Sequence, residues 1–268
     1  MHLSAPVFVL KSHAKELKKR KNIPLSQALN EVAQGEGYAS WSLLISGTAE
    51  LYPRKFSEML DFLNAGDLVL LAARPGMGKT TFAFGLVAQA IKCTRPKSHL
   101  FTLVERALEA RQRLSAYSDF FDQGEAHCFI DSSDDICADY IISTTGDRIT
   151  RDSLIVVDYL QLLDEKRINP PLERQIETLK NFAATSGCII VFLCQLDRQI
   201  GERSDQRPTI DDIRLPNPLD LKLFNKIVFL YREDFAANEA EVSFANPADH
   251  RFKIALDRES VRFSDVRE

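Results

Sequence analysis

The chain has 268 residues, 45% of them hydrophobic, so it is long enough to bury a substantial core. Its formal net charge of −4 excludes a protein whose whole surface attracts nucleic acid, and any such contact must come from local patches. No apolar run approaches the length of a membrane span, and the N-terminus lacks the pattern of a signal peptide. We therefore expect a cytoplasmic protein with no membrane contact.

The cysteines favour the same compartment. They are scattered without a Cys-x-x-Cys pair, and two of them stand in apolar runs typical of strands: the five are Cys93, Cys128, Cys137, Cys188 and Cys194. This usage is typical of reduced, mostly buried thiols and not of a disulfide framework or a zinc site.

Residues 1–50 are predicted to form a small basic helical module or arm in front of a larger domain over residues 51–268. Six basic residues crowd into positions 11–21, and Asn22-Ile23-Pro24 follows them, which predicts a basic helix that ends there. Apolar residues from Leu25 to Val32 recur at helical spacing and predict a second helix. The basic face has two interpretations, contact with phosphates or simple solvation.

From Phe56 onward the pattern alternates between helices and strands. A helix is predicted around Phe56 to Leu63, and the strand candidates are Asp67–Ala73, Leu100–Val104, Cys128–Ile130, Leu154–Val157, Ile189–Leu193, Ile227–Tyr231 and Phe252–Leu256. Strands separated by helices predict an α/β fold with a mostly parallel, twisted sheet flanked by helices. Such sheets bind ligands at the carboxyl ends of their strands.

A glycine-rich loop follows the first of these strands. It reads Arg74-Pro75-Gly76-Met77-Gly78-Lys79-Thr80-Thr81 and leads into an amphipathic helix. Strand, loop and helix together predict a P-loop that binds ATP through its backbone N–H groups, with Lys79 on the β/γ-phosphates and Thr80 on Mg²⁺. Ala73 stands where the strict pattern has its first glycine, and a simple tight turn at Gly76 and Gly78 is the alternative.

Two further predicted strands are followed by polar residues. The run Leu154–Val157 ends in Asp158, which is expected to hold Mg²⁺ opposite Thr80, usually through water. The run Ile189–Leu193 leads to Gln195, which is expected to hydrogen-bond the γ-phosphate region or the attacking water. The alternatives are a helix cap for Asp158 and an ordinary polar strand end for Gln195.

These motifs together resemble the C-terminal RecA-like motor domain of the DnaB-type replicative helicases, which also carry Ala in place of the first P-loop glycine. The resemblance covers about residues 56–262. It rests on Asn64-Ala65-Gly66-Asp67, Ala73 to Thr80, Asp158-Tyr159-Leu160-Gln161-Leu162, Gln195-Leu196-Asp197-Arg198 with Glu202-Arg203, Arg207 to Arg214, Tyr231-Arg232-Glu233-Asp234 and Lys253 to Arg258.

The resemblance implies a RecA-like P-loop ATPase that acts as a helicase or translocase on single-stranded DNA in replication. It also implies self-association, including a hexameric ring, and replication proteins as partners. A RecA-superfamily recombination or clock-type ATPase is a weaker alternative, because Asp158 to Leu162 and Arg207-Pro208-Thr209 fit the helicase branch better.

The chain departs from the family at the residue taken as the base for hydrolysis. Val104 occupies the position of the family's Glu, and the carboxylate follows one residue later as Glu105. In a regular strand this slip turns the side chain to the opposite face. Either a local distortion brings Glu105 to the water as the catalytic base, or hydrolysis is slow and the domain is an ATP-binding switch or accessory protein.

Two further departures concern the neighbouring subunit and DNA. Of the family's Lys-x-Arg pair only Arg258 remains, which is expected to be an arginine finger or else a surface partner of Asp257 or Glu259. The segment after Arg214 contains two prolines where the family has a Glu-Ser-Gly stretch. Contacts to single-stranded DNA are therefore expected from basic residues around this loop: Arg198, Arg203, Arg207 and Arg214, with Lys222 a further candidate.

Overall fold

The computed structural model describes residues 3–5, 7–49, 52–93, 97–102, 104–115, 117, 128–164, 169–213, 215, 217–245 and 250–266. No helix among these residues is long and apolar enough to span a lipid bilayer.

The described residues form a nine-stranded sheet in the order β3-β2-β4-β5-β1-β6-β7-β8-β9. The strands from β3 to β6 in this order run parallel, and the last three are antiparallel. The prediction of a mostly parallel α/β sheet is therefore confirmed. The strands are β1 (Leu68–Ala73), β2 (Ser98–Thr102), β3 (Cys128–Asp131), β4 (Leu154–Asp158), β5 (Ile189–Gln195), β6 (Lys226–Tyr231), β7 (Glu239–Phe244), β8 (Arg251–Asp257) and β9 (Arg262–Asp265).

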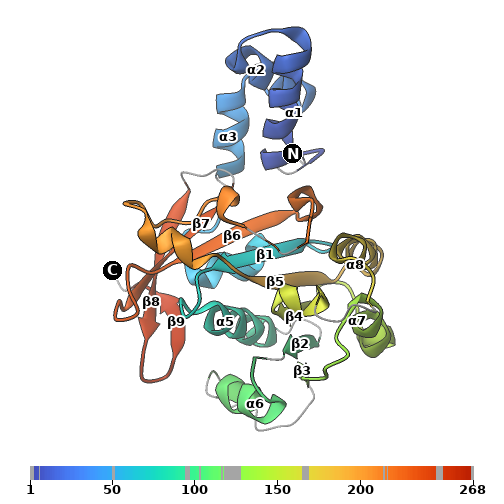
Figure 1. Cartoon of the computed structure of the whole chain (residues 1–268), viewed down its shortest axis with the longest axis vertical. Coiled ribbons are helices and arrows are strands. Elements are labelled where there is room, and N and C mark those ends of the chain that lie inside the picture. Colours follow the sequence, from blue (N-terminus) through green and yellow to red (C-terminus); the bar gives the residue numbers. More distant parts are fainter. Residues whose placement is uncertain are drawn as a thin grey trace.

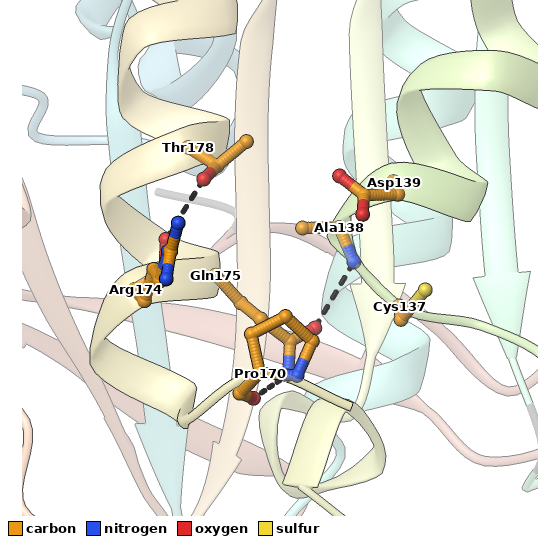
Figure 2. Close-up of a pocket in the computed structure, with 7 residues that line it drawn as sticks. All are labelled: Cys137, Ala138, Asp139, Pro170, Arg174, Gln175 and Thr178. Atoms are coloured by element: carbon orange, nitrogen blue, oxygen red, sulfur yellow. Dashed lines mark hydrogen bonds between the residues drawn. The ribbon is translucent and has the colours of Figure 1, made fainter. Parts of the chain in front are cut away.

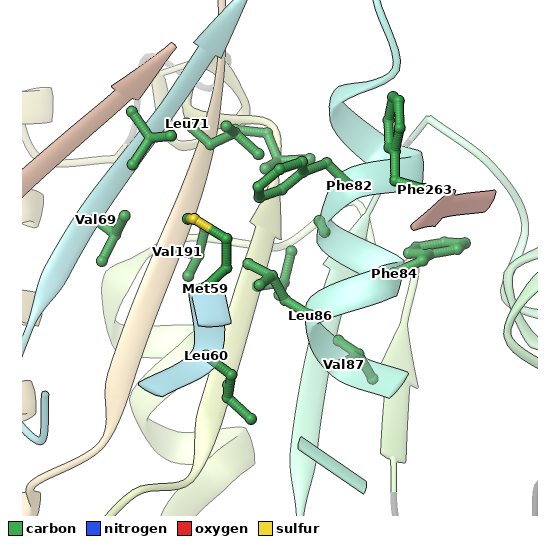
Figure 3. Close-up of a cluster of buried hydrophobic side chains, with 14 of the residues drawn as sticks. Met59, Leu60, Val69, Leu71, Phe82, Phe84, Leu86, Val87, Val191 and Phe263 are labelled. Carbon is green, nitrogen blue, oxygen red and sulfur yellow. The ribbon is translucent and has the colours of Figure 1, made fainter. Parts of the chain in front are cut away.

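Helices cover both faces of this sheet (Figure 1). Residues of α5 (Lys79–Lys92) and α6 (Ala107–Ser115) belong to one buried cluster, and those of α7 (Ala138–Thr145) and α8 (Leu172–Ser186) belong to another. The central strand β1 supplies both clusters, because alternate side chains of a strand point to opposite faces. In Figure 3, Phe82 and Leu86 of α5 point towards Val69 and Leu71 of β1.

Two strands were not predicted from the sequence. The β7 segment alternates between buried and less buried residues as a half-buried strand does, but its glutamates give it no continuous apolar run. The β9 segment has four residues and pairs only with β8. Strand β2 is also displaced from its prediction, because it ends at Thr102 and not at Val104.

The N-terminal residues form three helices, α1 (Val7–Lys21), α2 (Leu25–Gly35) and α3 (Trp41–Ala49), at one end of the molecule (Figure 1). The predicted basic helix and the helix that follows are present. Val7 and Leu10 of α1 pack with Ala33 and Leu44 in a small cluster of their own. The division into residues 1–50 and 51–268 as separate domains stays a prediction.

A buried glutamine joins the starts of α7 and α8, beside a small pocket lined by both helices (Figure 2). Gln175 is 1% exposed, and both the oxygen and the nitrogen of its carboxamide form hydrogen bonds. Its Oε1 accepts from the Ala138 N–H at 3.0 Å, and its Nε2 donates to the carbonyls of Leu163 at 2.6 Å and Pro170 at 2.8 Å.

We expect Gln175→Leu to lower the free energy of unfolding by about 3 kcal/mol, because three buried backbone groups lose their partner. Urea denaturation of the whole chain measures this. The control is Gln199→Leu, whose side chain is exposed and whose effect is expected within about 0.5 kcal/mol of zero. Equal losses in the two variants would contradict the assigned role of the carboxamide.

His99 lies fully buried in β2, and its two ring nitrogens have no hydrogen-bond partner among the described residues. Burial, with smaller contributions from Arg148 and Lys97, lowers its pKa from 6.5 to about 4. Between these two values the unfolded chain binds a proton that the folded chain does not, so stability falls as the pH falls through this window.

The loss is expected to reach at most about 3 kcal/mol near pH 4. His99→Phe, which keeps an aromatic ring against Phe129, is expected to remove this part of the pH dependence. Urea unfolding of both proteins at pH 7 and pH 4.5 tests the assignment. The assignment is wrong if the free energy of unfolding falls equally in the wild type and in His99→Phe between these pH values.

Candidate nucleotide-binding site

The glycine-rich loop lies between the carboxyl end of β1 and the start of α5. Gly76 and Gly78 have φ values of 73° and 101°, in the left-handed region that glycine tolerates. Helix α5 begins at Lys79, directly after Gly78, which has no side chain to cap the helix. The N–H groups of the first turn are therefore open to an anionic ligand, and the positive end of the helix dipole favours phosphate there.

Two aromatic rings pack against the loop from the antiparallel part of the sheet. A Cβ at Gly76 would lie 2.4 Å from Cε1 of Phe235, and a Cβ at Gly78 would lie 2.9 Å from Cζ of Phe263. At Gly78, close approach to the buried Phe263 as well as backbone conformation favours glycine, whereas at Gly76, beside the exposed Phe235, the backbone conformation is the stronger reason. The sequence did not point to either phenylalanine, because both contacts join segments far apart in the chain.

Lys79, Thr80 and Asp158 meet at one edge of the sheet, where β1 and β4 both flank β5. The Thr80 hydroxyl donates to Oδ2 of Asp158 at 2.8 Å. The Lys79 ammonium donates to the carbonyls of Ala73 at 3.2 Å and Arg74 at 3.4 Å. The predicted pair of Thr80 and Asp158 therefore lies together.

Burial dominates the electrostatics of these groups. It lowers the pKa of Lys79, against the attraction of Asp158. It raises the pKa of Asp158, against the Thr80 hydrogen bond and the charge of Lys79. A hydroxyl and a carboxylate at 2.8 Å are hard oxygen donors, which fit Mg²⁺ completed by phosphate oxygens and water.

The other side chains of the loop face the protein. Arg74 donates to Gln206 Oε1 at 3.1 Å and to the carbonyl of Arg232 at 3.2 Å. Met77 and Thr81 are buried. In this arrangement, Arg74 and Met77 can contribute to phosphate binding through their backbone N–H groups only, and the Met77 N–H donates to the Arg74 carbonyl at 3.4 Å. Pro75, which has no N–H, contributes by shaping the loop.

Glu105 and Val104 differ in burial. The Val104 side chain is exposed, with 55% of its residue surface accessible, whereas the Glu105 side chain is 10% exposed. Because β2 ends at Thr102, strand alternation does not govern residues 104 and 105. The backbone instead turns there, with the Val104 N–H donating to the Thr102 hydroxyl at 3.1 Å. The one-residue slip therefore does not by itself fix the direction of Glu105, and its role as the catalytic base stays a prediction.

Arg113 of α6 holds the Glu105 carboxylate. Its Nη1 lies 2.7 Å from Glu105 Oε1, and its Nη2 donates to the Thr81 hydroxyl at 3.2 Å. The guanidinium also lies 4.6 Å from the centre of the Phe84 ring. Glu105 is thus connected to helix α5 through one side chain that the sequence reasoning missed. No local motif relates this arginine to the glutamate, because Glu105 lies before the start of α6 at Ala107.

The carboxyl of Glu105 is electrostatically part of the same site. Burial raises its pKa, Arg113 opposes that rise, and the charge of Asp158 adds to it. A carboxyl with a raised pKa beside a candidate Mg²⁺ position is typical of a general base.

A match to the model of a protein family shows which family the chain belongs to. The model described as "DnaB-like helicase C terminal domain" matches residues 52–119 and 107–261. The chain belongs to this family. The resemblance predicted from the motifs is confirmed.

Individual relatives agree with this assignment. The replicative DNA helicase DnaB of Mycoplasma genitalium is 29% identical over 76% of this chain and 50% of its own length. The replicative DNA helicase DnaC of Bacillus subtilis is 27% identical over 84% of this chain and 57% of its own length. The chain spans about half the length of the curated relatives it matches.

Solved structures show the same fold. One solved ATPase domain superposes with a TM-score of 0.67 at 24% identity, over 84% of this chain and 98% of that one. A DnaB-like replicative helicase, described with its interactions with primase, superposes with a TM-score of 0.69 at 22% identity, over 96% of this chain and 75% of that one.

The remaining predicted residues of the DnaB-like domain lie around this site. Gln195 ends β5 beside Ala73 of β1, and it is exposed. Arg258 follows β8, is also exposed, and donates to the carbonyls of Phe235 at 3.3 Å and Ala236 at 3.4 Å. Within the described part of the chain it forms no ion pair with Asp257 or Glu259, and the Asp257 carboxylate accepts from the Ser260 hydroxyl instead.

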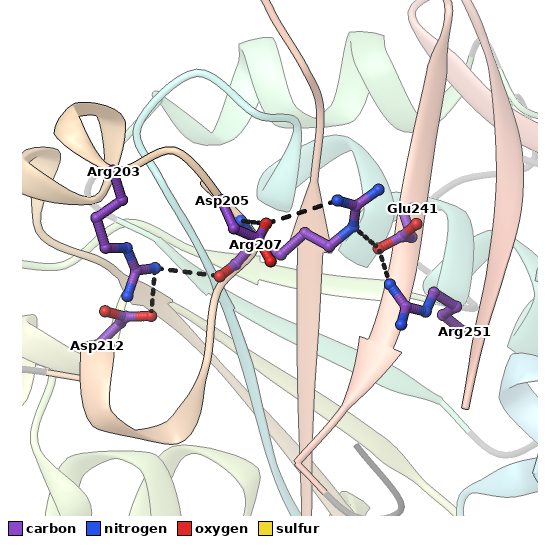
Figure 4. Close-up of polar contacts among 6 residues, drawn as sticks. All are labelled: Arg203, Asp205, Arg207, Asp212, Glu241 and Arg251. Atoms are coloured by element: carbon purple, nitrogen blue, oxygen red, sulfur yellow. Dashed lines mark hydrogen bonds and ion pairs between the residues drawn. The ribbon is translucent and has the colours of Figure 1, made fainter. Parts of the chain in front are cut away.

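Two of the arginines predicted to contact DNA, Arg203 and Arg207, are held in a polar network (Figure 4). Arg203 donates to Asp212 Oδ2 at 3.0 Å and to the carbonyl of Arg207 at 3.1 Å. Arg207 donates to Glu241 Oε1 at 2.8 Å, and its side chain remains 46% exposed. Arg214 and the side chain of Arg198 lie outside the described residues, so their predicted role in a basic channel stays a prediction.

Proposed function

We propose that this DnaB-like domain binds and hydrolyses ATP and acts as a helicase or translocase on single-stranded DNA. The observation that carries the proposal is the Thr80–Asp158 pair at the start of α5, together with a largely buried Glu105 carboxylate whose pKa the charge of Asp158 helps to raise. A phosphate-binding loop alone supports nucleotide binding, whereas a positioned base beside it supports hydrolysis.

In this proposal, each of these residues has its own role. Loop N–H groups and Lys79 bind the phosphates, with Lys79 leaving the carbonyls of Ala73 and Arg74 to do so. Thr80 and Asp158 hold Mg²⁺, which when bound neutralises charge on the phosphate oxygens. Glu105 accepts a proton from the attacking water, and Gln195 orients that water or senses the γ-phosphate.

Assembly and DNA binding extend the proposal to other surfaces. The exposed Arg258 is proposed to reach the nucleotide of a neighbouring subunit in a ring, including a hexamer, and to stabilise charge on the transferred phosphoryl group. Arg198, Arg203, Arg207 and Arg214 are proposed to contact the DNA backbone. We place the protein in the cytoplasm among replication proteins.

An ATP-binding switch with little hydrolysis is the second candidate, and one contact favours it. The ion pair at 2.7 Å between Glu105 and Arg113 occupies the carboxylate that must accept the proton. If nucleotide binding does not free this carboxylate, the site binds ATP and turns it over slowly.

The deciding experiment measures ATP turnover of the whole chain with and without an oligo-dT strand, together with its mass in solution with and without an ATP analogue. The motor predicts turnover that the strand stimulates and a ring-sized mass. Tight ATP binding by a monomer without turnover would establish the switch instead. Lys79→Ala is the control that removes nucleotide-dependent signals in either case.

A further inference from the structure

Helix α1 carries a row of cations that the nucleotide site does not use. Lys11, Lys15 and Lys18 recur at spacings of four and three residues, and Lys19 follows, so all four share one side of the helix. All four are exposed. We call these four residues the lysine row.

The lysine row is without acidic partners in the described part of the chain. Among the basic residues of α1, Lys21 forms an ion pair in this part of the chain, with Glu31 at 2.6 Å. Glu16, the acidic residue of the helix, is exposed and makes no ion pair with a described residue. The charge of the row is therefore not neutralised within the described chain, although the whole protein carries a net charge of −4.

The side of α1 that borders the lysine row is already occupied. Val7, Leu10 and Ala14 are buried, and the first two pack with Ala33 and Leu44 of the helices that follow. A helix that inserts into a lipid surface needs an exposed apolar face beside its cations. None of the α1 side chains that the structure describes is both apolar and exposed, which favours a hydrophilic polyanion as the partner of the row.

The dimensions of the row fit a nucleic-acid strand. From Lys11 to Lys19 the helix rises by about 12 Å, at about 1.5 Å per residue. Phosphates follow one another along a strand of B-form DNA at about 3.4 Å of axial rise. About four lysines thus face about four phosphates.

We propose that the lysine row of α1 binds the phosphate backbone of nucleic acid without sequence preference. This contact lies outside the nucleotide site and does not depend on ATP hydrolysis. It adds to the DNA contacts of the proposed motor and would hold a strand even when the nucleotide site is inactive.

The test is the salt dependence of binding by the whole chain, without nucleotide, to a fluorescent oligo-dT strand. Fluorescence anisotropy is recorded between 50 and 200 mM KCl. The test variant replaces the four lysines of the row with glutamine (K11Q/K15Q/K18Q/K19Q). The control removes four exposed positive charges elsewhere (K55Q/K92Q/K97Q/R151Q).

We expect the test variant to bind at least about tenfold more weakly at 100 mM KCl, with the slope of log K against log salt smaller by about 3. The control variant is expected to keep most of the wild-type affinity. A charge-preserving variant with four arginines in the row is expected to restore binding, which separates loss of charge from loss of folding.

Three results would overturn the proposal. One is an absence of strand binding by the wild-type chain, and another is an equal change of slope in the test and control variants. The third is a test variant that no longer binds vesicles rich in phosphatidylserine while its salt slope on oligo-dT is unchanged. That result would assign the row to a lipid surface. The test is run without nucleotide and records no turnover, so failure of the proposed motor and failure of this proposal are distinguishable.

Discussion

Glu105→Gln is expected to lower the maximal rate of ATP turnover by about 10²–10⁴-fold and to leave ATP binding within a few-fold of the wild type. The reason is that glutamine keeps the size of the side chain beside Arg113 but cannot accept the proton of the attacking water. Steady-state turnover and equilibrium binding of a fluorescent ATP analogue measure the two quantities separately.

Val104 offers a matched control at the neighbouring position. Because its side chain is exposed, Val104→Gln is expected to change the rate by less than about twofold. Val104→Glu is likewise expected not to raise turnover. A large gain in Val104→Glu, or unchanged turnover in Glu105→Gln, would show that Glu105 is not the base.

The parts of the site that the sequence predicted are those decided by local patterns. Asp158 follows an apolar strand, and Thr80 follows a glycine-rich loop after another. Parallel strands bring their carboxyl ends to one edge of a sheet, so the meeting of these side chains follows from the fold class. The two motifs and the strand order together account for the contact of Thr80 with Asp158 at 2.8 Å.

The direction of Glu105 was beyond that reasoning, because it depends on where a strand stops. Phe101 pairs with Asp131 of β3, and Thr102 pairs with Asp158 of β4, but the ladder does not extend further. The end of β2 is therefore decided by its neighbours and not by its own apolar residues. Once the strand stops, the one-residue slip no longer determines which way the carboxylate points.

Arg113 and Phe235 were missed for a related reason. Arg113 reaches Thr81 because α6 packs beside α5, and Phe235 reaches Gly76 because β6 lies beside β1. Neither residue belongs to a motif with a fixed spacing from its partner. Long-range contacts of this kind are set by how whole elements pack, which a reading of single segments does not supply.

The ion pair of Arg113 has two opposed effects on the proposed base. It fixes the carboxylate near the Thr80–Asp158 pair, and it lowers the pKa that burial would otherwise raise further. It also competes with the water for the same carboxylate. On balance we expect the positioning and the lowered pKa to dominate at neutral pH, because a base must be deprotonated and in place before it can act.

Arg113→Ala is therefore expected to lower the maximal rate of turnover by about tenfold at pH 7 and to move the acid limb of its pH profile to higher pH. Removing the guanidinium raises the pKa of Glu105 further, so the base form is lost at a higher pH as the solution is acidified. Part of the lost rate should return by pH 9. The profile of kcat between pH 5 and pH 9 measures the shift.

Two variants separate this electrostatic role from a structural one. Arg113→Lys keeps the positive charge and is expected to keep the acid limb near its wild-type position, whereas Arg106→Ala removes an exposed arginine directly before the same helix and is expected to change neither quantity. The pKa of Glu105, followed by NMR of the labelled carboxyl, should rise in Arg113→Ala even if the chain hydrolyses ATP slowly. An acid limb and a Glu105 pKa that both stay in place would show that Arg113 does not control the base.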